Sequence, residues 1–319
     1  MRRLLLAGAT LVLAGSSSLS ACDLCALYTA FAASDARAGW SVGLSEQFTS
    51  FGTVQQEGEP VADPFDQSLR SSITQVVVAY QWHERFGVQA NLPWIDRSFR
   101  RLEDGAVESG RERGVGDVAV LAHWRALERV AFTRTLRVTL LGGVKLPTGS
   151  SDRLAEEVEE GRGAHGGPGA AGAVHGHDLA LGSGSTDLVA GLSLAATFGR
   201  GYLSARAQQA FRGTGDFDYR FGDDFQYGVA GGGYVVLRHD RSLALGVGLA
   251  GEHKQEDRLA GEALDDTAID SLFAGPLASL TLGEVWFGEL ALDLPVAIDN
   301  SGLQIVPDWR VRLALTRRF

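Results

Sequence analysis

The 319-residue sequence is poor in sulfur and in long apolar runs. It contains two cysteines and one methionine. After residue 21 it has no run of about 18 apolar residues, which excludes a transmembrane helix from that part of the chain. A basic excess is also missing, because the formal net charge is −10. General nucleic-acid binding, which depends on a basic surface, is therefore excluded, and no phosphate-binding loop motif occurs.

The first 21 residues are typical of a secretory signal peptide. Two arginines precede an apolar run from Leu4 to Ala14, and small residues follow it. The stretch Leu-Ser-Ala-Cys, which ends at Cys22, resembles the lipobox cut by the bacterial lipoprotein signal peptidase. We expect residues 1–21 to be removed and residues 22–38 to form a periplasmic segment.

Both cysteines lie in that segment, as Cys22 and Cys25 of a C-x-x-C motif. Haem attachment would need a histidine where Ala26 stands. Three interpretations stay open. Cys22 is lipidated, or the two thiols form a disulfide or redox-linked pair, or they capture a metal with ligands supplied from elsewhere.

Apolar residues alternate with small or polar residues along most of the remaining chain. Trp40, Val42 and Leu44 show the pattern, and about twelve such segments of about ten or more residues follow one another. A period of two is typical of strands, and this length suits a tilted strand that crosses a bilayer. The pattern predicts an all-β protein, a transmembrane antiparallel up-and-down β-barrel of about 12 strands over residues 39–319. A soluble β-sandwich is less suitable, because its strands are about half as long.

The connections between these segments alternate between long and short. Polar loops are expected after the odd-numbered strands, and short turns such as 83–85, 199–201 and 238–241 after the others. Long loops on one side are typical of outer-membrane barrels, in which they face the cell exterior. The sequence therefore predicts the outer membrane of a Gram-negative bacterium, with outer-membrane lipid around the barrel.

Charged residues at the alternate positions should point into the barrel. We expect Asp117 and Asp187 to pair with Arg137, Lys145 or Arg206 of neighbouring strands. A glycine-rich wall, including Gly228, Gly246, Gly248 and Gly275, should stand opposite the charged one. The full set of candidate lumen-lining residues is Asp117, Arg125, Arg137, Lys145, Asp187, Arg206, Glu289, Asp293, Arg310 and Arg312.

Several of these stretches resemble a known family. GVGDVAVLAHWR (114–125), GVKLPTGSS (143–151) and GSGSTDLVAGLSL (182–194) resemble the meta-pathway phenol-degradation family of outer-membrane barrels, as do FGVQANLPWIDRS (86–98) and GELALDLPVAIDNS (288–301). The resemblance implies a transporter of small molecules without enzyme activity. It does not cover the C-x-x-C motif, and we carry no substrate over from it.

The longest connection, residues 150–184, contains four glutamates followed by His165, His175 and His177. Imidazole suits Zn²⁺ and Cu²⁺, so these three histidines are the candidate metal ligands. On a glycine-rich loop, however, they are not preorganised, and we expect a flexible, solvated loop that can cover the pore. Apart from such a metal, no cofactor is expected.

The last residues, LALTRRF, end in an aromatic. We expect Phe319 to be part of the signal that the barrel-assembly machinery recognises. The protein is thus predicted to be a passive outer-membrane channel for small-molecule solutes and not an enzyme, because His253 shares its face with no suitable serine. The alternative is a non-conducting barrel that serves as a scaffold, or as a metal- or redox-handling partner of a periplasmic protein, through the C-x-x-C motif and the histidine-rich loop.

Overall fold

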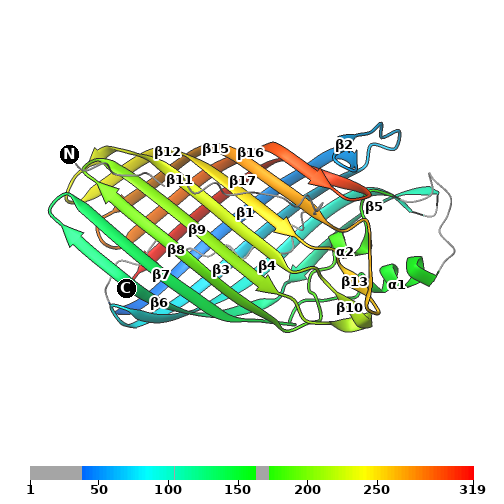
Figure 1. Cartoon of the computed structure of the whole chain (residues 1–319), viewed down its shortest axis with the longest axis horizontal. Coiled ribbons are helices and arrows are strands. Elements are labelled where there is room, and N and C mark those ends of the chain that lie inside the picture. Colours follow the sequence, from blue (N-terminus) through cyan, green and yellow to red (C-terminus); the bar gives the residue numbers. More distant parts are fainter. Residues whose placement is uncertain (1–37, 104, 163–171) are drawn as a thin grey trace, which may run out of the picture.

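The computed structural model describes residues 38–103, 105–162 and 172–319 as a closed antiparallel barrel of 12 strands (Figure 1). Each strand pairs with its neighbour in the chain, and the last pairs with the first. The strands of the wall are β1 (Gly39–Gln56), β3 (Ser68–His83), β4 (Phe86–Glu103), β6 (Val118–Ala131), β7 (Arg134–Leu146), β8 (Asp187–Phe198), β9 (Gly201–Phe211), β11 (Asp224–Leu237), β12 (Arg241–Lys254), β15 (Ile269–Leu282), β16 (Trp286–Asn300) and β17 (Leu303–Arg318). The predicted fold is confirmed.

The two faces of the wall have opposite chemistry. Outward side chains such as Leu44, Leu249 and Leu313 are about half exposed, whereas inward ones such as Gln47 and Arg125 are buried. This is the reverse of a soluble protein, and it follows from the period of two together with a lipid-facing exterior. Closure of the sheet leaves no edge strand unpaired in the hydrocarbon layer, and the barrel is an outer-membrane barrel.

The two ends of the barrel differ as predicted. Short turns at 84–85, 132–133 and 199–200 lie at one end, together with the start of β1 and the end of β17. The long connections lie at the other end, on the right in Figure 1. By the rule that periplasmic turns are short, that end faces the exterior.

At the outer end, two segments that were predicted to be polar loops are instead paired β-strands. β4 is followed by β5 (Ala106–Val115), and the two pair from Trp94↔Val115 to Glu103↔Ala106. β16 and β17 are joined by residues 301–302 alone, where a polar loop was expected. In both places the strand continues after its apolar residues end, because a ladder outside the bilayer needs no lipid-facing side chains.

Small elements cover the outer end. They are β2 (Glu59–Pro60), α1 (Leu154–Arg162), α2 (Gly176–Leu179), η3 (Asp216–Asp218), β10 (Tyr219–Arg220), β13 (Arg258–Leu259) and β14 (Glu262–Ala263). Within the described ranges, no helix is long and apolar enough to cross a membrane.

The seam of the ring joins β17 to β1. The pairing runs from Ser41↔Arg318 to Gln56↔Leu303 with irregularities near Phe51. At its periplasmic end the amide of Phe319 donates to the carbonyl of Trp40 at 2.9 Å. The two ends of the described wall are therefore in direct contact.

Candidate functional site: the barrel lumen

The lumen is filled at its outer end by the connection between β7 and β8. We call its described parts, residues 151–162 and 172–184, the mouth segment. Ala173, Val174 and Leu179 pack with residues of the barrel wall, including Phe99 and Ile305, in one apolar cluster. On the other side, a second cluster joins this segment to the outer-end connections, and its members are Leu154, Ala180, Tyr219 and Phe221. The segment thus contacts opposite sides of the mouth.

Polar contacts fix the mouth segment to several parts of the barrel wall. Arg97, only 1% exposed, donates from Nη1 to the carbonyls of Asp178 (2.7 Å) and Ala180 (2.9 Å). The side-chain oxygen of Gln67 accepts from the amide of Ala173 at 2.9 Å. Ile305 of β17 donates its amide to the carbonyl of Ala173, also at 2.9 Å. The prediction of a solvated, flexible loop is wrong for these residues, because their apolar side chains are buried in the barrel and their backbone is hydrogen-bonded.

The two described histidines of this segment are buried rather than solvated. His177 Nδ1 lies 2.9 Å from Glu157 Oε1, and the His177 amide donates to the same oxygen at 2.7 Å. Burial opposes both charges, yet the paired His177 lowers the pKa of Glu157 to about 2. Burial likewise opposes a charged His177 ring, but the carboxylates of Asp178 and Glu157 raise its pKa well above the ordinary value. The pair is therefore ionic at neutral pH.

The metal prediction stays untested by these contacts. His175 stacks on His177 with ring centroids 5.5 Å apart. In the described part of the chain no group of three His, Cys, Asp or Glu side chains is arranged to hold a metal ion. The third candidate, His165, lies outside the described residues, and so do Cys22 and Cys25.

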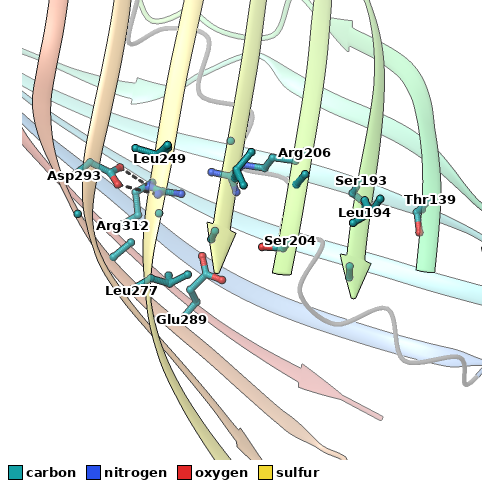
Figure 2. A pocket seen from close by; sticks show the side chains of 18 of the residues that line it. Thr139, Ser193, Leu194, Ser204, Arg206, Leu249, Leu277, Glu289, Asp293 and Arg312 are labelled. Atoms are coloured by element: carbon teal, nitrogen blue, oxygen red, sulfur yellow. Dashed lines mark hydrogen bonds and ion pairs between the residues drawn. The ribbon is translucent and has the colours of Figure 1, made fainter. Parts of the chain in front are cut away.

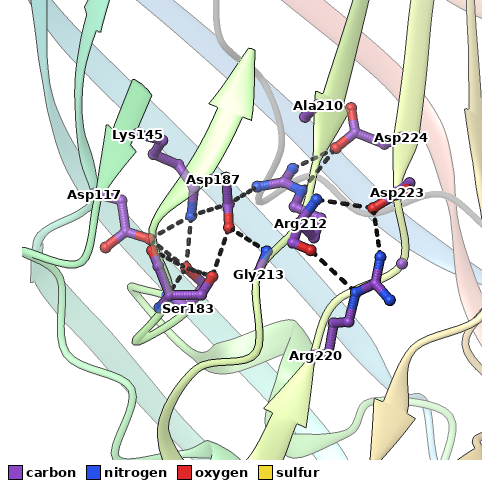
Figure 3. Close-up of polar contacts among 12 residues, drawn as sticks. Asp117, Lys145, Ser183, Asp187, Ala210, Arg212, Gly213, Arg220, Asp223 and Asp224 are labelled. Carbon is purple, nitrogen blue, oxygen red and sulfur yellow. Dashed lines mark hydrogen bonds and ion pairs between the residues drawn. The ribbon is translucent and has the colours of Figure 1, made fainter. Parts of the chain in front are cut away.

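Below the mouth segment, a row of alternating charges crosses successive strands (Figure 3). We call Asp117, Lys145, Asp187, Arg212 and Asp224 the charge belt. Lys145 Nζ lies 2.5 Å from Asp117 and 2.9 Å from Asp187. Arg212 reaches Asp187 at 2.8 Å and contacts Asp224 with two nitrogens. All five side chains are at least nine-tenths buried.

The charge belt also holds the mouth segment in place. Asp117 accepts from the amides of Gly149 (3.0 Å) and Ser183 (2.9 Å), at both ends of the connection. The next strand continues the alternation, with Lys254 2.6 Å from Asp257. Lys145 and Lys254 are the only lysines in the sequence, and both are buried here.

The sequence identified three of the five residues of the charge belt. Lys145 does pair with Asp117 and Asp187, as predicted. Arg212 and Asp224 were missed, because they follow or begin their strands beyond the apolar alternation. The signal that could have found them is register, since Asp224 is the first residue of β11 and its side chain is buried on the inward face.

A cavity of about 210 Å³ lies in the lumen and is lined by residues of strands from β7 to β17 (Figure 2). Five of the predicted lumen-lining residues, Arg137, Arg206, Glu289, Asp293 and Arg312, line it. Most of the remaining lining is small, with Gly228, Gly248 and Gly275 among it. The cavity therefore combines a polar wall with room for a small solute.

Four arginines in or beside this cavity are in ion pairs. Arg312 holds Asp293 with two bonds of 2.7 and 3.0 Å, and Arg310 contacts the same carboxylate at 3.1 Å. Arg137 pairs with Glu128 at 2.6 Å, not with Asp117 or Asp187 as expected. Arg125 joins the same glutamate at 3.2 Å. Arg137 lies near the periplasmic end of β7, whereas Lys145 lies near its outer end. Arg137 is therefore too far from the charge belt to reach Asp117 or Asp187.

The glycines of the wall make room for long inward side chains. A Cβ atom on Gly228 would lie 3.2 Å from the guanidinium Nε of Arg206. A Cβ on Gly246 would lie 2.3 Å from the hydroxyl of Tyr202, whose ring also covers Gly232. In the closed ring β15 stands across from the charged strand β6, as predicted, whereas β11 is a direct neighbour of the charged strand β9.

Phe319 is 66% exposed, and the guanidinium of Arg317 lies over its ring at 4.7 Å. It belongs to the periplasmic rim with Trp40 and Trp286. Its place is compatible with an assembly signal, which stays a prediction.

Comparison with known proteins supports the fold. No family model and no curated protein matches the chain. Among solved structures, the COG4313 outer membrane channel from Pseudomonas putida F1 is similar, with 17% identity and a TM-score of 0.59 over 89% of this chain and 96% of that one. The beta domain of the Bordetella autotransporter BrkA (10%, TM-score 0.45, 89% and 100%) and the CymD monoaromatic hydrocarbon channel (10%, 0.36, 90% and 90%) also match. The first of these likenesses confirms the barrel fold that the sequence resemblance implied.

Proposed function

We propose that the protein is a passive outer-membrane channel for small polar solutes. The observation that carries the proposal is the central cavity, because its lining is charged and small at once. A polar solute that enters the lumen must give up hydrogen bonds to water. Charged side chains in a hydrated lumen can replace those hydrogen bonds, so the free-energy cost of entry is small, whereas an apolar lumen could not replace them. The outer-membrane channel from Pseudomonas putida F1, which has a similar fold, supports the same class of function.

The mouth segment defines how such a channel would work. It lies between the exterior and the cavity and is fixed to the wall on opposite sides. A solute would have to pass around it, so we expect low conductance and selection by size. No enzyme activity is part of this proposal.

The cavity lining also sets an ionic preference. Three arginines face two carboxylates there, an excess of one positive charge. Anions should therefore permeate more readily than cations. Arg137→Gln together with Arg206→Gln leaves one arginine against two carboxylates and should reverse the preference.

Planar-bilayer recordings in a salt gradient test both points. Reversal potentials give the anion-to-cation permeability ratio for wild type and for the double variant. The matched control is Arg70→Gln with Arg100→Gln, which removes the same charge from exposed positions. The channel proposal fails if the folded wild type shows no openings. The cavity's part in selectivity fails if the control shifts the ratio as much as the lumen variant does.

A further inference from the structure

A second hollow lies on the lipid-facing surface of the barrel, near the outer ends of the strands. It has a volume of about 590 Å³ and is lined mostly by outward residues of five neighbouring strands. On the side towards the exterior, the hollow is lined by a row of residues that pair directly across the strands. The members of this row are Gln209, Phe225, His253, Asp270 and Asp299. We call this row the polar row.

The hollow exists because the next row of residues towards the periplasm has few side chains that could fill the space. That row runs Tyr227, Gly251, Leu272 and Ala297. Gly251 contributes no side chain, and the Tyr227 ring folds over it, so that a Cβ there would lie 2.2 Å from the ring. Phe225 stacks on Tyr227 at 5.9 Å. Two aromatic faces therefore border the hollow.

The row below these is apolar and faces lipid. Val229, Leu249 and Leu294 are 46–49% exposed and pair across the same strands through Ala274. The hollow thus lies at the boundary where the hydrocarbon-facing wall meets the polar outer end. A molecule that fills it would have a polar group beside the polar row and a chain against these apolar residues.

The charges of the polar row define the polar group. Asp270 and Asp299 are directly opposite each other on β15 and β16, and like charges in such a pair repel. His253 Nδ1 contacts Asp270 at 3.1 Å, and no lysine or arginine lines the hollow among the described residues. Carboxylates beside aromatic faces are the chemistry that recognises an ammonium group, through ion pairing and cation–π attraction.

From this geometry we infer that the hollow binds the headgroup of a lipid that carries a protonated amine. The ammonium lies between the two aspartates and the aromatic pair, and the acyl chains follow Val229, Leu249 and Leu294. The lipid assignment, rather than a soluble amine, rests on the opening of the hollow directly onto the lipid-facing wall. Asp299 lies at its far border, where it also approaches the turn at Gly58.

The experiment is native mass spectrometry of the detergent-solubilised protein with phosphatidylethanolamine or with phosphatidylglycerol of the same chains. We expect one tightly retained phosphatidylethanolamine, with an apparent affinity at least tenfold above that of phosphatidylglycerol. Asp270→Asn with Asp299→Asn should lower it at least tenfold. Gly251→Ala, which pushes the Tyr227 ring into the hollow, should do the same without altering charge.

The matched control is Asp240→Asn with Asp265→Asn, two exposed carboxylates outside the hollow. It should bind as wild type does, and all variants must first show the heat-dependent migration of a folded barrel. Equal binding of the two lipids, or unchanged binding by both hollow variants, would overturn the inference. Loss of binding on adding EDTA would point to a bridging metal ion instead, and equally tight binding of chain-free phosphoethanolamine would refute a lipid site.

Discussion

At the scale of single residues, the buried charges of the outer lumen decide how firmly the mouth is closed. Lys145 is shared between two carboxylates, and one of them, Asp117, also accepts from the amides of Gly149 and Ser183 at the two ends of the connection. Removing one partner of a buried ion pair leaves the other charge uncompensated, which typically costs about 3 kcal/mol or more. The arrangement therefore concentrates the stability of the mouth in few side chains.

We expect Lys145→Met to loosen the mouth segment by about 3 kcal/mol, because Asp117 then lacks its cation and Asp187 keeps only Arg212. The variant should be cut by trypsin within residues 151–184 under conditions that leave the wild type intact. Arg317→Met, which removes a cation from an exposed side chain, should stay resistant. Equal resistance of the two variants would show that the belt does not hold the segment.

The ion pair of Glu157 and His177 gives the same segment a pH dependence. The lowered pKa of Glu157, about 2, means that its contribution is complete above the ordinary value of about 4.3 and is lost as the pH falls towards 2. The raised pKa of His177 means that its contribution is complete below about pH 6.5 and is lost only as the pH rises through the folded pKa.

Hydrogen exchange of residues 172–184, corrected for the intrinsic rate, should therefore show greatest protection between about pH 4.5 and 6.5. Glu157→Gln should flatten this profile, whereas His83→Ala, at the exposed end of β3, should not. A profile that is the same in wild type and in Glu157→Gln would contradict the assignment.

At the scale of elements, the connection between β7 and β8 behaves as an internal plug rather than a lid. Deleting residues 155–180 should raise single-channel conductance severalfold, because both apolar contacts across the mouth are lost. Deleting residues 105–106, which are exposed between β4 and β5, is the control and should leave conductance unchanged. No change after the first deletion would mean that solutes already pass freely beside the segment.

The elements also show what a sequence can reveal. The period of two located all twelve strands, because the lipid-facing side must be apolar in every strand. The same rule could not place the ends of β4 and β16, since outside the bilayer a ladder continues without apolar residues. Nor could it show that His177 is buried, because that depends on contacts between residues far apart in the chain, such as Arg97 and Asp178.

At the scale of the whole molecule, closure of the sheet governs stability. To release any strand, two ladders must be broken together, so unfolding should be slow. We expect the unheated protein to migrate differently from the boiled protein in SDS electrophoresis, with β-type circular dichroism before heating. The two lysines add a chemical check, since an amine-reactive ester should label Lys145 and Lys254 only after boiling. Labelling of both in the unheated sample would contradict the buried belt.

The contact between Phe319 and Trp40 has a topological consequence. With these two residues hydrogen-bonded, a short linker could make the wall a covalent circle, and new ends could be cut in the turn at 283–285. Such a circular permutant keeps every ladder, so it should refold in detergent as the wild type does. In cells, however, its last strand ends at Leu282, without a terminal aromatic. If insertion is poor and is restored by appending phenylalanine after Leu282, the signal recognised by the assembly machinery is distinct from the sequence features that determine the fold.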